Sequence, residues 1–292
     1  MGKNTYVAVG NAEDISDVIT NISPKDTPFF SACGKVKATA TNHEWLEDSL
    51  RAPADNKKVE GFEYAVSDPT PRVRLGNYTQ IFSVGYGVTN TQEVVMKHGV
   101  TSEIAYQMRK AMKEIAMDVE RALITQAAKS AGSATVARQF GGVPFFIGTN
   151  TVNGAAGDPI SEEMMNDALQ KCWEKGGVPK KVYLSGNNKR IVSSWSGDGD
   201  KYLEQNSKKL VSAINVYESD FGIVSFVAHR MMDDNKVFVI DPDYWKVAEL
   251  RKMHTKPLPE TGDNKKRVIV GEMTLEARAE KANAVITLTP GP

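Results

Sequence analysis

Histidine and cysteine are the residue types of this chain best suited to catalysis or metal binding, and they are few and scattered. None of them has the H-E-x-x-H or C-x-x-C spacing that gathers metal ligands. His43-Glu44, followed by Asp48, is a pattern in which a base and its orienting carboxylate can be imagined. A hydrolytic enzyme using His43 and Glu44 is therefore an alternative hypothesis, although no metal and no cofactor is expected. The histidines and cysteines are His43, His98, His229, His254, Cys33 and Cys172.

The usual catalytic and phosphate-binding motifs are missing from the sequence. There is no G-x-S-x-G, no Walker loop and no G-x-G-x-x-G. Asp198-Gly-Asp200 has the start of a calcium loop without its later ligands or closing Glu, so it indicates a solvated loop tip. Asp233-Asp234-Asn235 is typical of a turn before a strand. These residues favour a structural role over chemistry.

Composition points the same way. The chain has 292 residues, is 41% hydrophobic and carries 36 basic and 36 acidic residues, which gives a net charge of zero. A protein that binds nucleic acid tightly normally shows a basic excess or stripe. No apolar run reaches the roughly 18 residues of a membrane span, and no signal peptide follows Met1. We expect synthesis in a reducing cytoplasm and no membrane partner.

The first forty residues predict a jointed apolar arm. Asp14 can cap a short helix whose apolar face runs from Ile15 to Ile22, and Pro24 ends it. Thr27-Pro28 starts a second turn that carries Phe29 and Phe30. The arm has too little sequence to build a core of its own. We therefore expect Phe29, Phe30 and Trp45 to be anchors buried against another subunit.

A long two-stranded excursion follows. Alternation through Trp45 predicts the outgoing strand, a polar stretch covers 49–70, and residues 73–88 form a return strand broken by glycines. An isolated hairpin is marginal in water, so this one must lie against something. Its basic end is expected to form charged contacts with a neighbouring subunit. The cations concerned are Lys57, Lys58, Arg72 and Arg74.

A long helix is the clearest predicted element. Thr101 or Ser102 caps it, and a helical apolar period continues to Gly132. Its charged residues alternate in sign, which indicates an ordinary solvated face rather than a nucleic-acid surface. Another helix should begin after Ser161, a strand should cover 180–186, a helix 187–195, and a polar loop 196–209. Strands and helices mix without a βαβ rhythm, so the predicted class is α+β. The charged residues of the long helix include Arg109, Lys110, Lys113, Glu114, Asp118, Glu120 and Arg121.

Ordered fragments along the chain resemble one known family. They begin with Asp17-Val18-Ile19, Thr27-Pro28-Phe29 and His43-Glu44-Trp45, and they return near Asp241-Pro242-Asp243-Tyr244-Trp245 and Glu272-Met273-Thr274-Leu275-Glu276. In order and spacing they resemble the major capsid proteins of tailed bacteriophages. The match covers nearly the whole chain except roughly 150–230.

The resemblance implies the tailed-phage major capsid fold in four parts. Residues 1–38 would be the N-terminal arm, 39–90 the extended hairpin loop that overlaps a neighbour, and 91–150 the peripheral domain with its spine helix over 101–131. Residues 151–240 would be the axial domain, and 241–292 would return to the peripheral domain. Many relatives begin with a cleaved scaffolding segment. Met1 before the arm favours a separate scaffolding protein or none.

The implied function is structural. Copies of the chain would form pentamers and hexamers of an icosahedral virion shell around packaged double-stranded DNA, with non-specific DNA contact. Portal, and in some systems scaffolding or decoration proteins, would be its partners. We expect the cations of the excursion to meet acids of an adjacent copy, with Glu103 and Glu114 of the spine helix as candidates. The alternative with the same fold is a bacterial nanocompartment shell holding a cargo enzyme.

Overall fold

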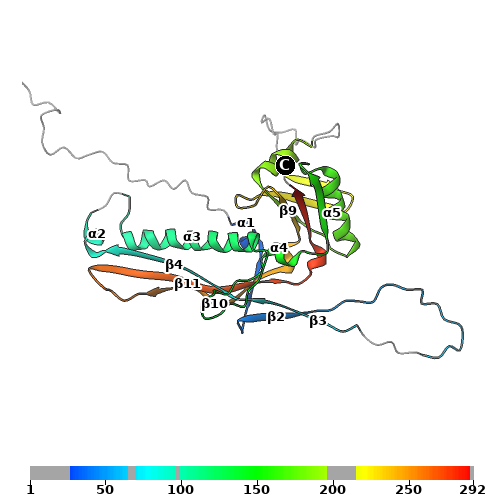
Figure 1. The fold of residues 1–292 in the computed structure, drawn as a ribbon, viewed down its shortest axis with the longest axis horizontal. Helices are drawn as coiled ribbons and strands as arrows, with labels where there is room; N and C mark the ends of the chain where they lie inside the picture. The colour runs from blue at the N-terminus through cyan, green and yellow to red at the C-terminus, as the bar shows by residue number, and fades with distance from the viewer. Residues whose placement is uncertain (1–26, 65–69, 97–98, 196–214, 290–292) are drawn as a thin grey trace, which may run out of the picture.

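A computed structural model describes residues 27–64, 70–96, 99–195 and 215–289. Figure 1 shows an elongated molecule in which helix α3 (Glu103–Thr125) runs along a long sheet. A compact part stands over one end of that sheet, and the excursion leaves below it, away from the end that carries α2 (Asn90–Val94). Helices and sheets occupy separate layers, so the α+β class is confirmed.

The start of the described chain belongs to the core of its own subunit. Thr27 precedes α1 (Pro28–Ala32), and β1 (Gly34–Lys37) then pairs in parallel with β10 (Trp245–Pro257). Phe29 is fully buried between α3, Tyr183 and Trp245. Phe29, expected to be buried against another subunit, is instead buried in a core that distant segments of its own chain build. The predicted helix over Ile15–Ile22 lies outside the described residues.

The hairpin is shorter than the sequence predicted. β2 (Asn42–Glu47) pairs antiparallel with β3 (Val73–Tyr78), from Asn42 opposite Tyr78 to Glu47 opposite Val73. After Thr79 the chain leaves the hairpin as β4 (Gln80–Thr89), which pairs with β11 (Asn264–Ala277). The predicted return leg is thus two strands in two sheets. The described segment 48–64 between β2 and β3 contains no helix and no strand.

The long sheet has the order β1-β10-β11-β4, and α3 covers one of its faces. Ser102 caps α3 by accepting a hydrogen bond from the amide of Ala105, as its sequence position predicted. The helix ends at Thr125 rather than near 131. Gly142 lies against the carbonyls that end the helix, where a Cβ atom would come within 2.5 Å of the Leu123 oxygen. The amide of Gly142 donates to the carbonyl of Gln126. The segment at Gly142 therefore occupies the place where a further turn of α3 would lie.

The compact part is a six-stranded sheet with the order β5-β12-β9-β6-β8-β7. Helices α5 (Glu162–Glu174) and α6 (Gly186–Ser193) pack on it around an apolar cluster, and their predicted Ser161 start and 187–195 location are close to what is observed. The sequence prediction assigned residues 241–292 to the peripheral domain. The last strand of that range, β12, instead completes the six-stranded sheet between β5 and β9. The polar loop predicted over 196–209 lies outside the described residues. The strands are β5 Thr151–Ala156, β6 Lys181–Leu184, β7 Val216–Ser219, β8 Gly222–Ala228, β9 Lys236–Ile240 and β12 Ala284–Thr289.

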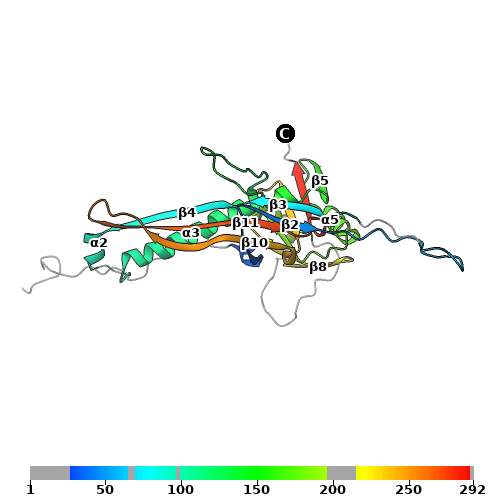
Figure 2. The ribbon, with the colours of Figure 1, turned by 90° about the horizontal axis from the view of Figure 1, so that it is seen from below.

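Short helical turns join the two parts of the molecule. They are α4 (Val143–Phe146) and two 3-10 turns, Pro242–Tyr244 and Glu280–Ala282. Seen from below in Figure 2, β4, β11 and β10 run side by side along α3. The excursion extends from the end of the molecule opposite to α2. The subunit core therefore holds the centre of the molecule and leaves both ends exposed.

Candidate assembly surfaces

His43 contacts a different carboxylate from the one that the enzyme hypothesis requires. Its Nε2 lies 2.9 Å from Oε2 of Glu276, a buried residue of β11. Arg278 donates from Nε to the other oxygen of Glu276 at 2.6 Å. Glu44 points to the solvent side, 3.5 Å from Arg74. His43 and Glu44 alternate across the strand, so they form no acid–base pair, and His43 instead ties the hairpin to the long sheet.

Trp45 completes this attachment of the hairpin base. Its indole Nε1 donates to the carbonyl of Ala277 at 2.8 Å, and its ring packs against Phe146. Asn77, fully buried in β3, donates to the carbonyls of Leu275 and Gly141. Trp45 is half-buried within its own chain. Its expected contact with another subunit therefore has only the remaining exposed part of the ring available.

A buried carboxylate holds the start of α1. Glu120 of α3 accepts hydrogen bonds from the amide nitrogens of Phe29 at 2.8 Å and Phe30 at 2.6 Å. It also accepts from Nε2 of His229 at 2.7 Å. Nδ1 of His229 accepts from the amide of Met231, which assigns the ring proton to Nε2. Glu120 thus joins the start of α1, the long helix and the compact part.

This position corrects two sequence expectations. Glu120 is not on a solvated face, because its exposed fraction is 0%. Phe29 is not free to contact another subunit, because its exposed fraction is also 0% within one chain. Phe30 is half-buried, and the ammonium of Lys35 lies 5.5 Å from its ring centroid. A signal for Glu120 was present in the sequence. Its helical neighbours three and four positions away, Ala116, Met117, Leu123 and Ile124, are all apolar.

A second buried carboxylate, on β11, joins the residue between β3 and β4 to β10. Glu272 accepts from the hydroxyl of Thr79 at 2.7 Å and from the guanidinium groups of Arg138 at 2.6 Å and Arg251 at 2.9 Å. The charge of Glu272 is therefore balanced by two guanidinium groups of its own chain. Sequence reasoning assigned no role to Glu272 beyond the family fragment, because its partners lie up to 193 positions away.

The charges expected at subunit contacts each have a local partner. Lys57 lies 3.0 Å from Asp55, Arg72 3.0 Å from Asp48, and Arg74 lies near Glu44 on the hairpin. The ammonium of Lys58 lies 5.9 Å from the ring centroid of Phe62. On α3, Glu103 accepts from Gln107 at 2.8 Å, and Glu114 lies 3.8 Å from Lys110. Within one chain the two groups are not brought together.

Large apolar side chains are exposed at both ends of the molecule. On the excursion, Leu50 and Tyr64 have exposed fractions of 98% and 89%. At the other end, Val94 and Met96 are 85% and 98% exposed. Isolated surface apolar residues are ordinary, whereas several of them near each end of an elongated chain make these ends candidate contact surfaces.

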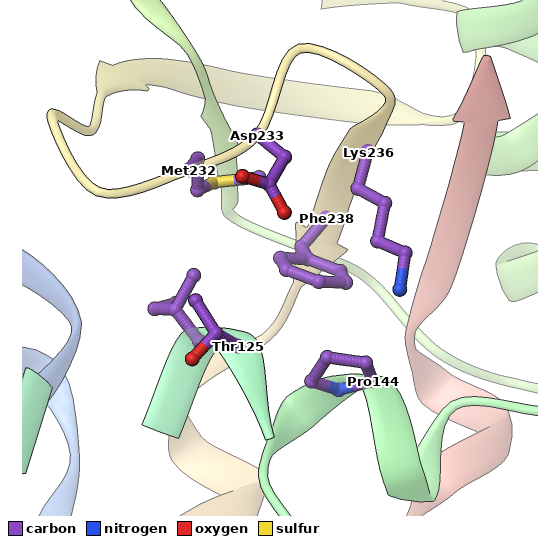
Figure 3. Close-up of a pocket in the computed structure, with 7 residues that line it drawn as sticks. Thr125, Pro144, Met232, Asp233, Lys236 and Phe238 are labelled. Carbon is purple, nitrogen blue, oxygen red and sulfur yellow. The ribbon is translucent and has the colours of Figure 1, made fainter. Parts of the chain in front are cut away.

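One enclosed cavity of the described residues is too small for a substrate. Figure 3 shows a cavity between the end of α3, α4 and β9, lined by residues that include Thr125, Pro144 and Phe238. Its volume is about 20 Å³, which suits one water molecule rather than a ligand. In the described ranges no three His, Cys, Asp or Glu side chains gather as a metal site. None of the described helices is long and apolar enough to cross a membrane.

Solved structures share this arrangement of an elongated sheet, a long helix and a compact part. One described as Mycobacterium phage Adephagia matches with a TM-score of 0.67 at 13% identity, covering 99% of this chain and 98% of its own. Another, described as the capsid of an empty GTA particle computed with C5 symmetry, gives 0.68 at 12% identity, covering 98% and 99%. The fold is that of capsid shell proteins.

The sequence comparisons name the family. The family model described as SU10 major capsid protein matches residues 2–290, so the chain belongs to that family of phage major capsid proteins. A relative, the major capsid protein of Escherichia phage Phieco32, is 23% identical over 341 aligned residues, covering 98% of this chain and 97% of the relative. The chain is therefore a structural component of the virion capsid and not an enzyme. The family also favours the virion over the nanocompartment.

Proposed function

We propose that copies of this chain assemble as pentamers and hexamers into an icosahedral shell that encloses packaged double-stranded DNA. The observation that carries the proposal is the excursion over 48–64, which leaves the body of the subunit and exposes large apolar side chains that the described part of the chain does not cover. Together with the family match over 2–290, this favours a shell in which each subunit covers the next.

The shape of the subunit supports closed rings. Its exposed apolar ends lie at opposite ends of the molecule, so a contact between them is heterologous. Heterologous contacts repeat around an axis and close when the rotation fits a ring. Rings of five and six subunits can then share one subunit fold, provided that the contact tolerates a small change of angle.

The zero net charge supports only a weak contact with DNA. Phosphate neutralisation supplies most non-specific affinity, and it weakens steeply with salt. The unassembled protein should therefore bind duplex DNA weakly and without sequence preference. A portal at one vertex, and scaffolding or decoration proteins where the system uses them, complete the proposed set of partners.

Expression of the protein with and without its neighbouring morphogenesis proteins tests the proposal. We expect mass photometry to detect pentamers or hexamers and negative-stain micrographs to show closed shells. Native particles should contain duplex DNA, whereas a packed enzyme would indicate the nanocompartment. A compact monomer under all protein and salt concentrations, with scaffold present, would refute the assembly. Sequence-specific DNA binding by the monomer would also contradict it.

A further inference from the structure

Strand β10 carries extra residues that its partner β11 does not match. The pairing register shifts once between Glu249 and Arg251, and again between Arg251 and His254. Each shift adds one residue to β10, so two β-bulges lie on either side of a single pair, in which Arg251 is opposite Glu272. We define residues 250–253 as the double bulge.

The double bulge begins where β10 loses a neighbouring strand. The pairing of β1 with β10 ends at Lys37 opposite Glu249, and beyond that point β10 is an edge strand. On its other side, β11 pairs with β4 without any shift of register, and α3 packs on both of these strands. The irregularity therefore belongs to the edge strand alone, while β4, β11 and α3 form a regular frame beside it.

The double bulge determines where the far end of the sheet points. A bulge bends the strand that carries it and increases the local twist. We define the distal ribbon as residues 254–257 of β10 and 264–270 of β11. Figure 1 shows these two strands reaching the end of the molecule that carries α2. The side chain of Asn90, at the start of α2, donates to Asp263 at 2.6 Å, so the direction of the ribbon also places α2.

The pair between the two bulges is held by side chains. Arg251 donates from Nε to Oε2 of Glu272 at 2.9 Å. The other oxygen of Glu272 accepts from Arg138 at 2.6 Å and from Thr79 at 2.7 Å, and the residue is only 4% exposed. Because Arg138 and Thr79 hold Glu272 in place, it is a fixed point. Arg251 ties the edge strand to that point in the middle of the double bulge.

A missing side chain makes room for the second bulge. Gly271 lies opposite it, and a Cβ atom on Gly271 would come within 2.7 Å of Cγ and 3.3 Å of Cα of Met253. Met253 packs against the apolar cluster of the long sheet, so it is not free to turn away. A side chain at position 271 would therefore push the bulged strand outward. The bend thus depends on one ion pair and one glycine.

On the basis of the proposed shell function, we propose that the double bulge sets the curvature of the shell. The direction of the distal ribbon fixes the angle between the α2 end and the compact part of each subunit. In an assembly of heterologous contacts that angle recurs in every copy and decides the rotation at which the contacts close. A small change of direction therefore adds up over many copies and changes the particle diameter. Arg251 and Gly271 are positioning residues for this angle.

The rival explanation is protection of a sheet edge. Natural sheets use bulges and exposed lysines to keep edge strands from pairing with other chains, and Lys252 and Lys256 are exposed on this edge. If protection were the whole role, loss of the bend would make subunits aggregate, but the shells that form would keep their diameter. Aggregation and diameter are therefore separate measurements.

Removing the tie is the first test. Arg251→Ala leaves Glu272 with Arg138 and Thr79, so the subunit should fold with a urea midpoint close to that of the wild type. Its shells should have a shifted mean diameter in cryo-electron micrographs. Arg278→Ala is the matched control, because Arg278 also donates from Nε to a buried glutamate of β11, and the Arg251 and Arg278 side chains are 47% and 49% exposed. An unchanged diameter for Arg251→Ala, or an equal shift for both variants, would refute the proposal.

Filling the space at Gly271 is an independent perturbation. Gly271→Ala should displace Met253 and shift the diameter, and adding Met253→Ala removes the closest atom and should return the diameter toward the wild-type value. Met253→Ala alone should keep it, as should Gly148→Ala, where no atom lies within 4 Å of the added Cβ. Wild-type shells from Gly271→Ala, or a shift that Met253→Ala does not reverse, would overturn the proposal. If Gly271→Ala does not fold, the comparison of Arg251→Ala with Arg278→Ala decides.

Cryo-electron microscopy maps of the altered shells identify the part that moves. When subunits are superposed on β4 and α3, the distal ribbon of Arg251→Ala should point in a new direction and the compact part should keep its place. A rotated compact part beside an unmoved ribbon would refute the proposal, and so would aggregation without a change of diameter. Failure of the wild-type protein to form shells would refute the proposed function instead.

Discussion

Removing the carboxylate of Glu120 should destabilise the subunit before any assembly takes place. Glu120→Ala leaves the amides of Phe29 and Phe30 and the imidazole Nε2 of His229 without an acceptor. A buried donor without a partner costs about 1–3 kcal/mol. Three such donors give about 3–9 kcal/mol, against a typical total stability of about 5–15 kcal/mol. Because α1 can separate from α3 and admit water, we expect a value near the lower end, about 3 kcal/mol.

Urea denaturation of the unassembled subunit, followed by circular dichroism, measures this loss. Glu120→Gln keeps the shape and one acceptor oxygen but directs an amide group at one of the donors, so it should lose about 1–3 kcal/mol. Asp118→Asn, at an exposed position of the same helix, should change stability by no more than about 0.5 kcal/mol. A loss below about 1 kcal/mol for Glu120→Ala would show that the carboxylate does not hold the start of α1.

Three further predictions concern buried groups of the unassembled subunit. Phe29→Ala should lower the free energy of unfolding of the subunit by about 3–5 kcal/mol, measured by urea denaturation. An effect seen only in assembled particles would show that Phe29 acts at a contact between subunits. The hydroxyl of Tyr183 is buried without a partner among the described residues, and burial raises its pKa. The unfolded chain releases this proton near pH 10, so stability should fall as the pH rises above that value; Tyr183→Phe should be as stable at pH 8 and lose less at pH 11, and a steeper loss would contradict this reasoning. Burial raises the pKa of Cys172 to about 12, so iodoacetamide at pH 8 should label Cys172 and Cys33 only after denaturation, and rapid native labelling would show that the core opens.

Elements set by local sequence were predictable. Ser102 and Ser161 each accept a hydrogen bond from an amide three positions on, and the helices that they cap begin where the sequence predicted. The alternating residues before Glu47 became β2. In each case the residues that decide the local structure lie within a few positions of one another, so the local sequence pattern is enough to predict the element.

Elements set by distant partners were not predictable from the pattern. β1 has four residues and exists because β10, more than 200 positions away, pairs with it in parallel. β12 joins the compact part because β5 and β9 leave a place between them. The same applies to the candidate contact surfaces. The sequence indicated an unsupported excursion, but it did not indicate the groove of about 470 Å³ that includes Gly85 and Lys266, because that groove forms where β4 and β11 lie side by side.

Folding and assembly depend on separate groups of residues in this subunit. His43 and Trp45 fix the hairpin base to β11, and Glu120 fixes the start of α1, all within one copy. Among the described residues, the exposed apolar side chains at the two ends of the molecule, such as Tyr64 and Met96, lie outside that core. A subunit can therefore fold completely while both ends remain unoccupied. In the proposed shell, each new copy would cover one exposed end of its neighbour and supply another, until a closed ring leaves no end uncovered.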